Sequence, residues 1–293
     1  MKPLRYWLNL LGVTVLSVSL ALILTANYLS SQWARVFLHP ARIPPNYQWL
    51  ETRNILYQDI ELTTQDGIIL SAWYTPPENG AVILVAHGYN ANRPESIHAL
   101  FVEHGYGVLT WDFRAHGVSG GDISTLGHDE QLDVKAALDF ALAQDGVERI
   151  GAWGGSMGAA TVLLAAAHHP ELEAVIADSS FPTFEDVLGL NVPISFLQPV
   201  VGFWWEFHSG AKIDDIRPVD VIGNISPRAV LIIDGWEGAA MAMNSPYRLY
   251  EAANEPKQIW VEDGVPHLGM FAHNPEEYTD TVIGFLDTFL LNK

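Results

Sequence analysis

The chain has 293 residues, 49% hydrophobic and 11% aromatic, enough for one large α/β domain with a filled core and a segment outside it. It contains no cysteine, which excludes disulfides and cysteine-ligated zinc sites. With 34 acidic and 15 basic residues the net charge is -19, which argues against nucleic-acid binding, because phosphate contacts need basic surface.

The N-terminal segment 1–35 is predicted to be a membrane anchor. Lys2 and Arg5 precede an uncharged, mostly apolar run at 6–33, and about 20 apolar residues suffice to span a bilayer. A cleaved signal peptide has a shorter apolar core and a small-x-small cleavage site, to which Leu24-Thr25-Ala26 is a poor match. A cleaved signal and a buried helix are the alternatives. The basic flank predicts a single pass with the rest of the chain outside the cytoplasm.

A proline-containing linker is predicted at 36–50, followed by a domain at 51–293. Two runs on either side of Asp66-Gly67 predict an antiparallel hairpin over 55–62 and 68–74. Short apolar runs then alternate with helical patterns, as is typical of a mostly parallel, doubly wound sheet. The predicted strands are 81–86, 106–111, 149–153, 174–177, 229–233 and 258–261, and the predicted helices are 96–103, 130–143, 157–168, 247–253 and 275–291.

Residues 181–225 interrupt this alternation, because the segment is too long for a single crossover and rich in apolar side chains. We expect a small helical cap over the functional site. Its large apolar side chains either line a substrate pocket or pack the cap onto the body. They are Phe196, Leu197, Phe203, Trp204, Trp205 and Phe207.

The motif Gly154-Gly155-Ser156-Met157-Gly158 fits the pattern G-x-S-x-G between a predicted strand and a predicted helix. In that context Ser156 sits at a strained turn with its hydroxyl exposed. Gly154 and Gly158 leave room for the neighbouring strand and helix. A serine hydroxyl is a poor nucleophile until a base removes its proton. The motif predicts a nucleophile at Ser156, with an incidental serine in a glycine-rich turn as the alternative.

Four motifs in chain order give the sequence a specific family resemblance over roughly residues 47–293. It resembles the α/β-hydrolases, in particular the single-domain serine hydrolases with an N-terminal anchor and a short cap. The resemblance implies an α/β-hydrolase fold with a mostly parallel, doubly wound sheet. The motifs are His87-Gly88-Tyr89, Asp112 to Gly120 (DFRAHGVSG), Gly154 to Gly158, and His267.

The resemblance implies a catalytic triad in the order serine, acid, histidine, with Ser156 first. His267 follows the last predicted strand, where this fold places its base, and His273 is the nearest alternative. The attack on a carbonyl creates an oxyanion, which needs two fixed donors. The backbone N–H groups of Met157 and Tyr89 are implied as these donors.

The sequence around the expected acid of the triad departs from the family pattern. After the strand at 229–233 the family tends to have His-Gly, two residues and then the catalytic Asp, whereas this chain has Asp234-Gly235-Trp236-Glu237-Gly238. In register, the acid position is taken by Gly238, which has no carboxylate. We expect Glu237, one residue earlier and one methylene longer than Asp, to reach His267. Asp178 and Asp234 are the alternatives.

The predicted function is that of a membrane-anchored serine hydrolase that cleaves an ester through an acyl-enzyme on Ser156, without metal or organic cofactor. The apolar cap favours an uncharged or lipid-like ester. Peptidase and thioesterase activities on the same fold are alternatives. Outside the enzymes, the glycine at position 238 favours a catalytically silent, membrane-tethered binding protein. The predicted partners are the substrate and the membrane, with no nucleic acid.

Overall fold

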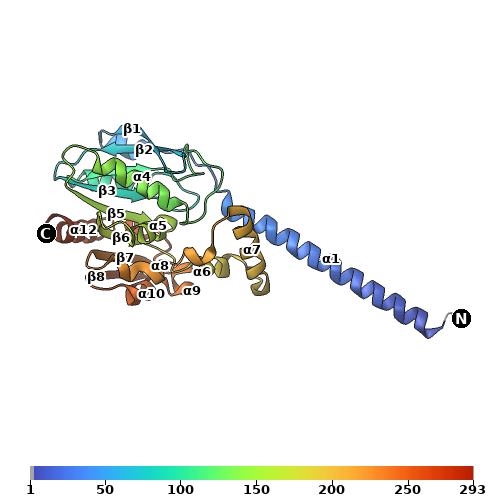
Figure 1. The fold of residues 1–293 in the computed structure, drawn as a ribbon. Helices are drawn as coiled ribbons and strands as arrows, with labels where there is room; N and C mark the ends of the chain where they lie inside the picture. The colour runs from blue at the N-terminus through green and yellow to red at the C-terminus, as the bar shows by residue number, and fades with distance from the viewer. Residues whose placement is uncertain (1–2, 293) are drawn as a thin grey trace.

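The computed structural model describes residues 3–292 and contains one eight-stranded sheet covered by helices, with a long N-terminal helix projecting from the body (Figure 1). The strand order is β1-β2-β4-β3-β5-β6-β7-β8. β1 pairs antiparallel with β2, and β2 antiparallel with β4, while all other pairs are parallel. The predicted opening hairpin and mostly parallel sheet are confirmed. The strands are β1 (Gln58–Thr63), β2 (Ile69–Thr75), β3 (Ala81–Ala86), β4 (Gly107–Trp111), β5 (Arg149–Gly155), β6 (Leu172–Asp178), β7 (Ala229–Trp236) and β8 (Lys257–Asp263).

Two apolar cores lie on the two faces of the sheet, because successive side chains of a strand point to opposite faces. In β3, where every residue is buried, Val82 and Leu84 belong to one core, and Ile83 and Val85 to the other. The first core is covered by α4 (Glu130–Leu142), α5 (Met157–Ala166) and α10 (Ser245–Ala252). The second is covered by α3 (Glu95–Val102) and α12 (Pro275–Leu286).

The helices expected from the sequence are all present, with ends that differ by a few residues. The expected final helix stops at Leu286 and continues as one π-helical turn, η4 (Asp287–Leu291). Three short helices were not expected: α2 (Gln48–Thr52), α9 (Ala239–Met243) and α11 (Met270–His273). Each spans about one turn, too short for a hydrophobic period to show in the sequence.

Helix α1 (Leu4–Leu38) ends beyond the end of the predicted anchor 1–35. Its apolar window has a mean hydropathy of 2.1 with none of it buried, so by length and composition the helix could cross a membrane. The last turns pack onto the body, where Ala34 and Leu38 are buried. The extended linker is therefore 39–47, rather than 36–50. Lys2 lies outside the described residues.

The cap lies between β6 and β7, within the predicted boundaries 181–225. Its longest helix, α7, lies at the base of α1 (Figure 1). Trp205 is fully buried, with its ring 4.7 Å from that of Phe184. This aromatic residue therefore packs inside the cap. The cap elements are α6 (Phe184–Asn191), η1 (Ser195–Leu197), α7 (Gln198–Ser209), η2 (Ile213–Asp215), α8 (Pro218–Val221) and η3 (Ile222–Ile225).

Candidate active site

Ser156 lies between β5 and α5 with φ 54° and ψ −116°, a backbone conformation that residues other than glycine rarely adopt. A Cβ on Gly154 would lie 2.4 Å from the carbonyl oxygen of Gly158, and one on Gly158 would lie 2.2 Å from that of Ala86 in β3. The glycines at these positions therefore let strand, turn and helix close around the serine. The Ser156 N–H donates to the carbonyl of Asp178 at 2.8 Å, which fixes the turn.

Ser156 and His267 are brought together from residues far apart in the sequence: Ser156 Oγ lies 2.9 Å from His267 Nε2. His267 is carried by the loop after β8. The protein around it lowers the pKa of His267 through desolvation, although the residue stays partly open to solvent. A neutral imidazole at this distance can accept the serine proton. His273, the alternative base, ends α11 and does not contact Ser156.

The loop after β3 approaches Ser156 closely. A Cβ on Gly88 would lie 3.2 Å from Cβ of Ser156, a tight contact, and the glycine relieves it. Met157 begins α5, and its N–H has no partner within that helix. Within residues 3–292 neither Tyr89 N–H nor Met157 N–H donates a hydrogen bond. Both amides border the same pocket as Ser156 and are free to receive an oxyanion.

His87 holds this loop in place. Its Nε2 accepts from the N–H of Phe113 at 2.9 Å, which requires Nδ1 to carry the proton and donate to the carbonyl of Gly88 at 2.7 Å. Burial lowers the pKa of His87 to about 3, so the ring stays neutral. The histidine of the His-Gly pair is thus a structural support for the Tyr89 amide.

None of the three candidate acids contacts His267. Among residues 3–292 His267 forms no ion pair, and its ring bonds to Ser156 alone. Glu237, the acid expected from the sequence, is exposed, and only its backbone N–H is bonded, to the carbonyl of Gly235 at 2.9 Å. This is a correction of the expected geometry: the chain turns at Gly238 into α9, and the Glu237 side chain is not delivered to the histidine.

Asp178 and Asp234 form a buried carboxyl pair behind the site. Asp178 accepts from Tyr278 at 2.7 Å and from Ser179 at 2.9 Å. Asp234 accepts from Ser245 at 3.2 Å through one oxygen, while its other oxygen has no partner within 3–292. Burial raises the pKa of Asp178 to about 6 and that of Asp234 to about 7, and the neighbouring Asp178 adds to the latter shift.

Ser179 connects this pair to the histidine loop. Its hydroxyl donates to Asp178 Oδ1 and accepts from the N–H of Leu268, the residue after His267, at 3.1 Å. Ser179 has φ 58° and borders the catalytic pocket. Nothing in the sequence pointed to this residue, because its role depends on a contact between β6 and the loop after β8.

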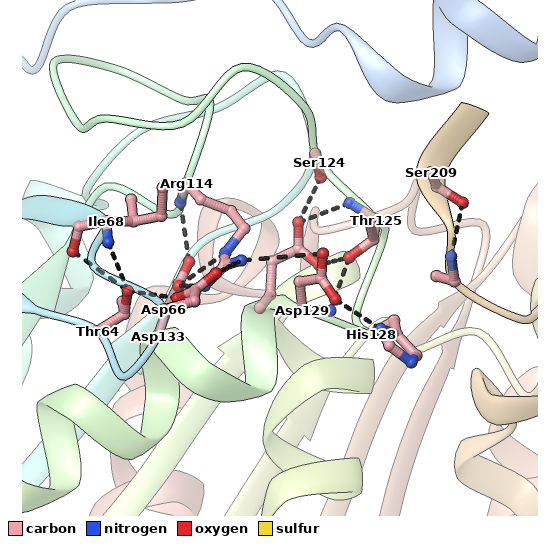
Figure 2. A network of polar contacts seen from close by, with 12 residues as sticks. Thr64, Asp66, Ile68, Arg114, Ser124, Thr125, His128, Asp129, Asp133 and Ser209 are labelled. Carbon is pink, nitrogen blue, oxygen red and sulfur yellow. Dashed lines mark hydrogen bonds and ion pairs between the residues drawn. The ribbon is translucent and has the colours of Figure 1, made fainter.

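Arg114 organises the long loop between β4 and α4 (Figure 2). Its guanidinium donates to Asp133 at 2.7 and 2.9 Å and to Asp66 at 2.8 and 3.1 Å. The same loop brings the Ser124 hydroxyl to 3.6 Å from Sδ of Met157. Arg114 is hydrogen-bonded to neither Ser156 nor His267, so its role is in the structure of the loop.

A pocket of about 450 Å³ opens over Ser156 and His267. The large apolar side chains singled out in the cap do not line it. Three of its wall residues, Trp33, Val36 and Phe37, belong to α1, which the sequence gave no reason to expect at the site. A second hollow, of about 510 Å³ on the outer side of the cap, carries neither Ser156 nor a histidine. The catalytic pocket is lined by Trp33, Val36, Phe37, Tyr89, Asn90, Leu126, Ser156, Met157, Ser179, Phe181, Val187, Leu190, Asn191, Ala239, Met243 and His267.

Comparison with known proteins finds hydrolases and proteins of the same fold. A family described as X-Pro dipeptidyl-peptidase (S15 family) matches residues 66–190. YqkD of Bacillus subtilis is 29% identical over 223 residues, covering 72% of this chain and 73% of that protein. The alpha/beta hydrolase domain-containing protein WAV2 of Arabidopsis thaliana is 27% identical, with 82% of each chain covered. The esterase Pf2001 of Pyrococcus furiosus superposes with a TM-score of 0.71 at 26% identity, covering 86% of this chain and 99% of that one.

Proposed function

Because this chain belongs to the α/β-hydrolase superfamily and is a hydrolase, we propose that it is a serine esterase that cleaves uncharged esters. The observation that carries the proposal is the 2.9 Å contact between Ser156 Oγ and His267 Nε2, with two unpaired backbone N–H groups beside it. A base within hydrogen-bond reach and a preformed oxyanion site are the two requirements of acyl transfer through serine.

The proposed reaction has two halves. His267 takes the proton of Ser156 as Oγ attacks the ester carbonyl, and the Tyr89 and Met157 amides stabilise the oxyanion. The intermediate collapses, the alcohol leaves with the proton from His267, and the acyl group stays on Ser156. His267 then takes a proton from water, the resulting hydroxide attacks the acyl-enzyme, and the carboxylic acid leaves as Ser156 regains its proton.

The pocket supports an ester rather than an X-Pro peptide as substrate. A dipeptidyl-peptidase must bind the protonated amino terminus of its substrate, and a buried cation needs a carboxylate partner. The side chains that line the pocket include no aspartate or glutamate, and most are apolar. A thioester presents the same acyl group and stays a secondary candidate.

The positioning of His267 differs from that of a complete triad. No carboxylate fixes its tautomer directly, so we propose that the loop contact from Ser179 to Leu268 N–H positions the ring. Ser179 is a positioning residue in this scheme. Asp178 holds Ser179 in turn, by accepting a hydrogen bond from its hydroxyl. Glu237 takes no part.

We propose further that α1 anchors the enzyme in a membrane by a single pass, with the catalytic domain outside the cytoplasm. The supporting features are the fully exposed apolar window of α1 and the basic Arg5 at its N-terminal end. A signal cleaved after Ala26 would remove the exposed apolar window but keep Trp33, Val36 and Phe37, which line the pocket. A retained anchor is therefore supported by the length of the apolar run and by its poor match to a small-x-small cleavage site.

Labelling with a fluorophosphonate tests the proposed chemistry, because this reagent reacts with an activated serine. We expect stoichiometric labelling of the full chain at Ser156 and none of Ser156→Ala. Hydrolysis is then compared between p-nitrophenyl esters and the matched Gly-Pro p-nitroanilide. A chain that does not label is catalytically silent, and one that cleaves only the anilide is a peptidase; either result overturns the proposal.

A further inference from the structure

The boundary between the free and the packed part of α1 is sharp. Residues 4–25 are all exposed, and contact with the body begins at Ala26. At about 1.5 Å per residue the free part is about 33 Å long, close to the thickness of the hydrocarbon core of a bilayer. A bilayer crossed by this part of α1 would therefore have its near surface at the base of the helix, where the body begins.

Helix α7 occupies this base. His208 Nε2 lies 2.9 Å from Ser31 Oγ of α1, and the ring of Trp204 stacks on His208 at 5.6 Å. Figure 1 shows α7 on the side of the body from which α1 projects. The helix is thus held at the level where the bilayer would end.

The outer side of α7 and the segment before it expose large apolar side chains. Phe203 is 59% exposed and Phe207 67%, one helical turn apart, with their rings stacked at 6.4 Å. Phe196 is 76% exposed, Leu190 47% and Ile194 44%. We call these five residues, Leu190, Ile194, Phe196, Phe203 and Phe207, the cap face.

The segment that carries the cap face is poor in charge within a strongly acidic protein, and Glu185 and Asp214, from outside this segment, border the same outer hollow as Phe203. Between residues 187 and 207 the only charged side chain is Glu206, which is ion-paired with Lys212 at 2.9 Å, while the chain as a whole carries a net charge of -19. An acidic surface is repelled by anionic headgroups, whereas an uncharged apolar face with aromatic rings partitions into the interface.

The cap face also borders the catalytic pocket. Leu190 belongs to both, and with Val187 of α6 it forms one wall of the pocket. The opposite wall is formed by Trp33 and Val36 of α1. The hydroxyl of Tyr89 donates to the carbonyl of Val36 at 2.6 Å, which ties the same end of α1 to the proposed oxyanion site. The pocket is therefore built between the two elements that meet the bilayer.

We propose that the cap face inserts into the bilayer that α1 crosses, and that the pocket takes acyl chains directly from this lipid layer. The insertion rests on the proposed membrane anchoring by α1, and the second half rests on the proposed esterase activity as well. The occupant is a lipid surface rather than a second copy of the chain, because α1 brings the cap face to the membrane at a fixed height in every molecule.

Fluorescence quenching tests the insertion. The chain has no cysteine, so a single introduced cysteine carries the only label. Full-length Phe203→Cys and Phe207→Cys, labelled with a polarity-sensitive dye, are placed in phosphatidylcholine nanodiscs with doxyl-labelled lipid. The control is Leu142→Cys, 50% exposed at the end of α4, which borders a hollow together with Ile150 near the start of β5, at the opposite end of that strand from Ser156.

We expect blue-shifted emission and at least twofold quenching at positions 203 and 207, and no quenching at 142. Equal, water-like emission at all three positions overturns the proposal. Shielding of 203 and 207 that depends on protein concentration in detergent, without quenching by lipid, indicates a second copy of the chain and also overturns it.

Activity on two presentations of an ester tests the lipid entry. The double variant Phe203→Ser, Phe207→Ser should keep its turnover of soluble p-nitrophenyl acetate within twofold, but lose about tenfold on p-nitrophenyl palmitate embedded in phosphatidylcholine vesicles. Leu142→Ser should change neither. Equal loss on both esters, or no loss on the embedded one, contradicts the entry route. Absence of serine labelling in the unaltered chain contradicts the proposed function and leaves the quenching result standing.

Discussion

The turns after two strands of this sheet have nearly the same backbone dihedral angles, but one is tightly packed and the other is open. After β5, Ser156 has φ 54° and ψ −116°; after β7, Gly238 has φ 55° and ψ −111°; each is followed by a helix. Around Ser156 the chain is packed so tightly that a Cβ on Gly154 or Gly158 would clash with backbone. A Cβ on Gly238 would have no neighbour within 4 Å. The fold thus builds two turns able to present a side chain, and only the first presents one.

The largest expected effect removes the side chain at the first turn. Ser156→Ala deletes one oxygen and should lower kcat on p-nitrophenyl acetate by at least about 10³-fold without changing the melting temperature. His267→Ala should be nearly as severe, because the two residues act as a unit. Ester turnover and circular dichroism of the purified chain check both. Full activity in a folded Ser156→Ala chain would show that Ser156 is not the nucleophile.

The packing around the two turns should respond differently to one added methyl group. Gly158→Ala places a Cβ 2.2 Å from the carbonyl oxygen of Ala86 and should destabilise the fold by about 2 kcal/mol or more. Gly238→Ala meets no neighbour and should cost only the strain of its positive φ, about 1 kcal/mol. Thermal unfolding of the two variants side by side measures the difference. Equal losses would mean that the turns are equally constrained.

Supplying the missing side chain at the second turn should increase the rate. Gly238 occupies the family's acid position, and the next residue, Ala239, lines the pocket together with His267. Gly238→Asp should therefore raise kcat by about tenfold, since a carboxylate fixes the histidine tautomer. Gly238→Asn, which has the same shape without the charge, is the control. A rate no higher than that of Gly238→Asn would show that position 238 cannot serve the base.

The contribution of the hydrogen bond between Ser179 and Leu268 to the positioning of His267 should be measurable. Ser179→Ala removes the acceptor for Leu268 N–H and should lower kcat several-fold, about 1 kcal/mol, with little change in KM. Ser179→Gly, which suits the φ of 58° but also lacks the hydroxyl, should lose about as much, so that the loss is assigned to the hydroxyl and not to backbone strain. Glu237→Gln should change kcat less than twofold, because its side chain contacts nothing at the site. A larger loss for Glu237→Gln than for Ser179→Ala would reverse this assignment.

The smallest expected effect is a shift in pH dependence. Burial lowers the pKa of His267 below its ordinary value of about 6.5, so the imidazole is neutral and active at lower pH. The acid limb of kcat/KM on a soluble ester should therefore have its midpoint below pH 6.5. In Gly238→Asp the new carboxylate favours the charged imidazole, and the midpoint should move upward. If the midpoint of the acid limb were the same in Gly238→Asp as in the unaltered chain, the new carboxylate would not reach the ring of His267.

Sequence reasoning predicted the parts of the molecule that depend on local patterns. The continuous apolar run of β3, the turn at Asp66-Gly67 and the G-x-S-x-G motif each lie within a few residues of what they form, and the fold followed from them. The pairing of Ser156 with His267 followed from chain order within a recognised fold, and the structure places these residues in contact.

The parts that could not be predicted depend on contacts between distant segments. Ser179 is important because β6 and the loop after β8 meet, and Trp33 lines the pocket because the end of α1 packs on the body. A register taken from the family placed Glu237 near the acid position. The direction of that side chain depends on the turn at Gly238, which the sequence does not encode as a pattern.

The joint between α1 and the body also has a consequence for the order in which the protein is made. A chain is synthesised from its N-terminus, so the proposed anchor enters the membrane before its partners exist. Ser31 of α1 can form its contact with His208 only after a further 177 residues have been synthesised. Val36 meets Tyr89 much sooner. The packing of α1 on the body is therefore completed only when the cap has been made, and His267 is made later still, so a ribosome stalled before α7 would leave a tethered chain without a complete site.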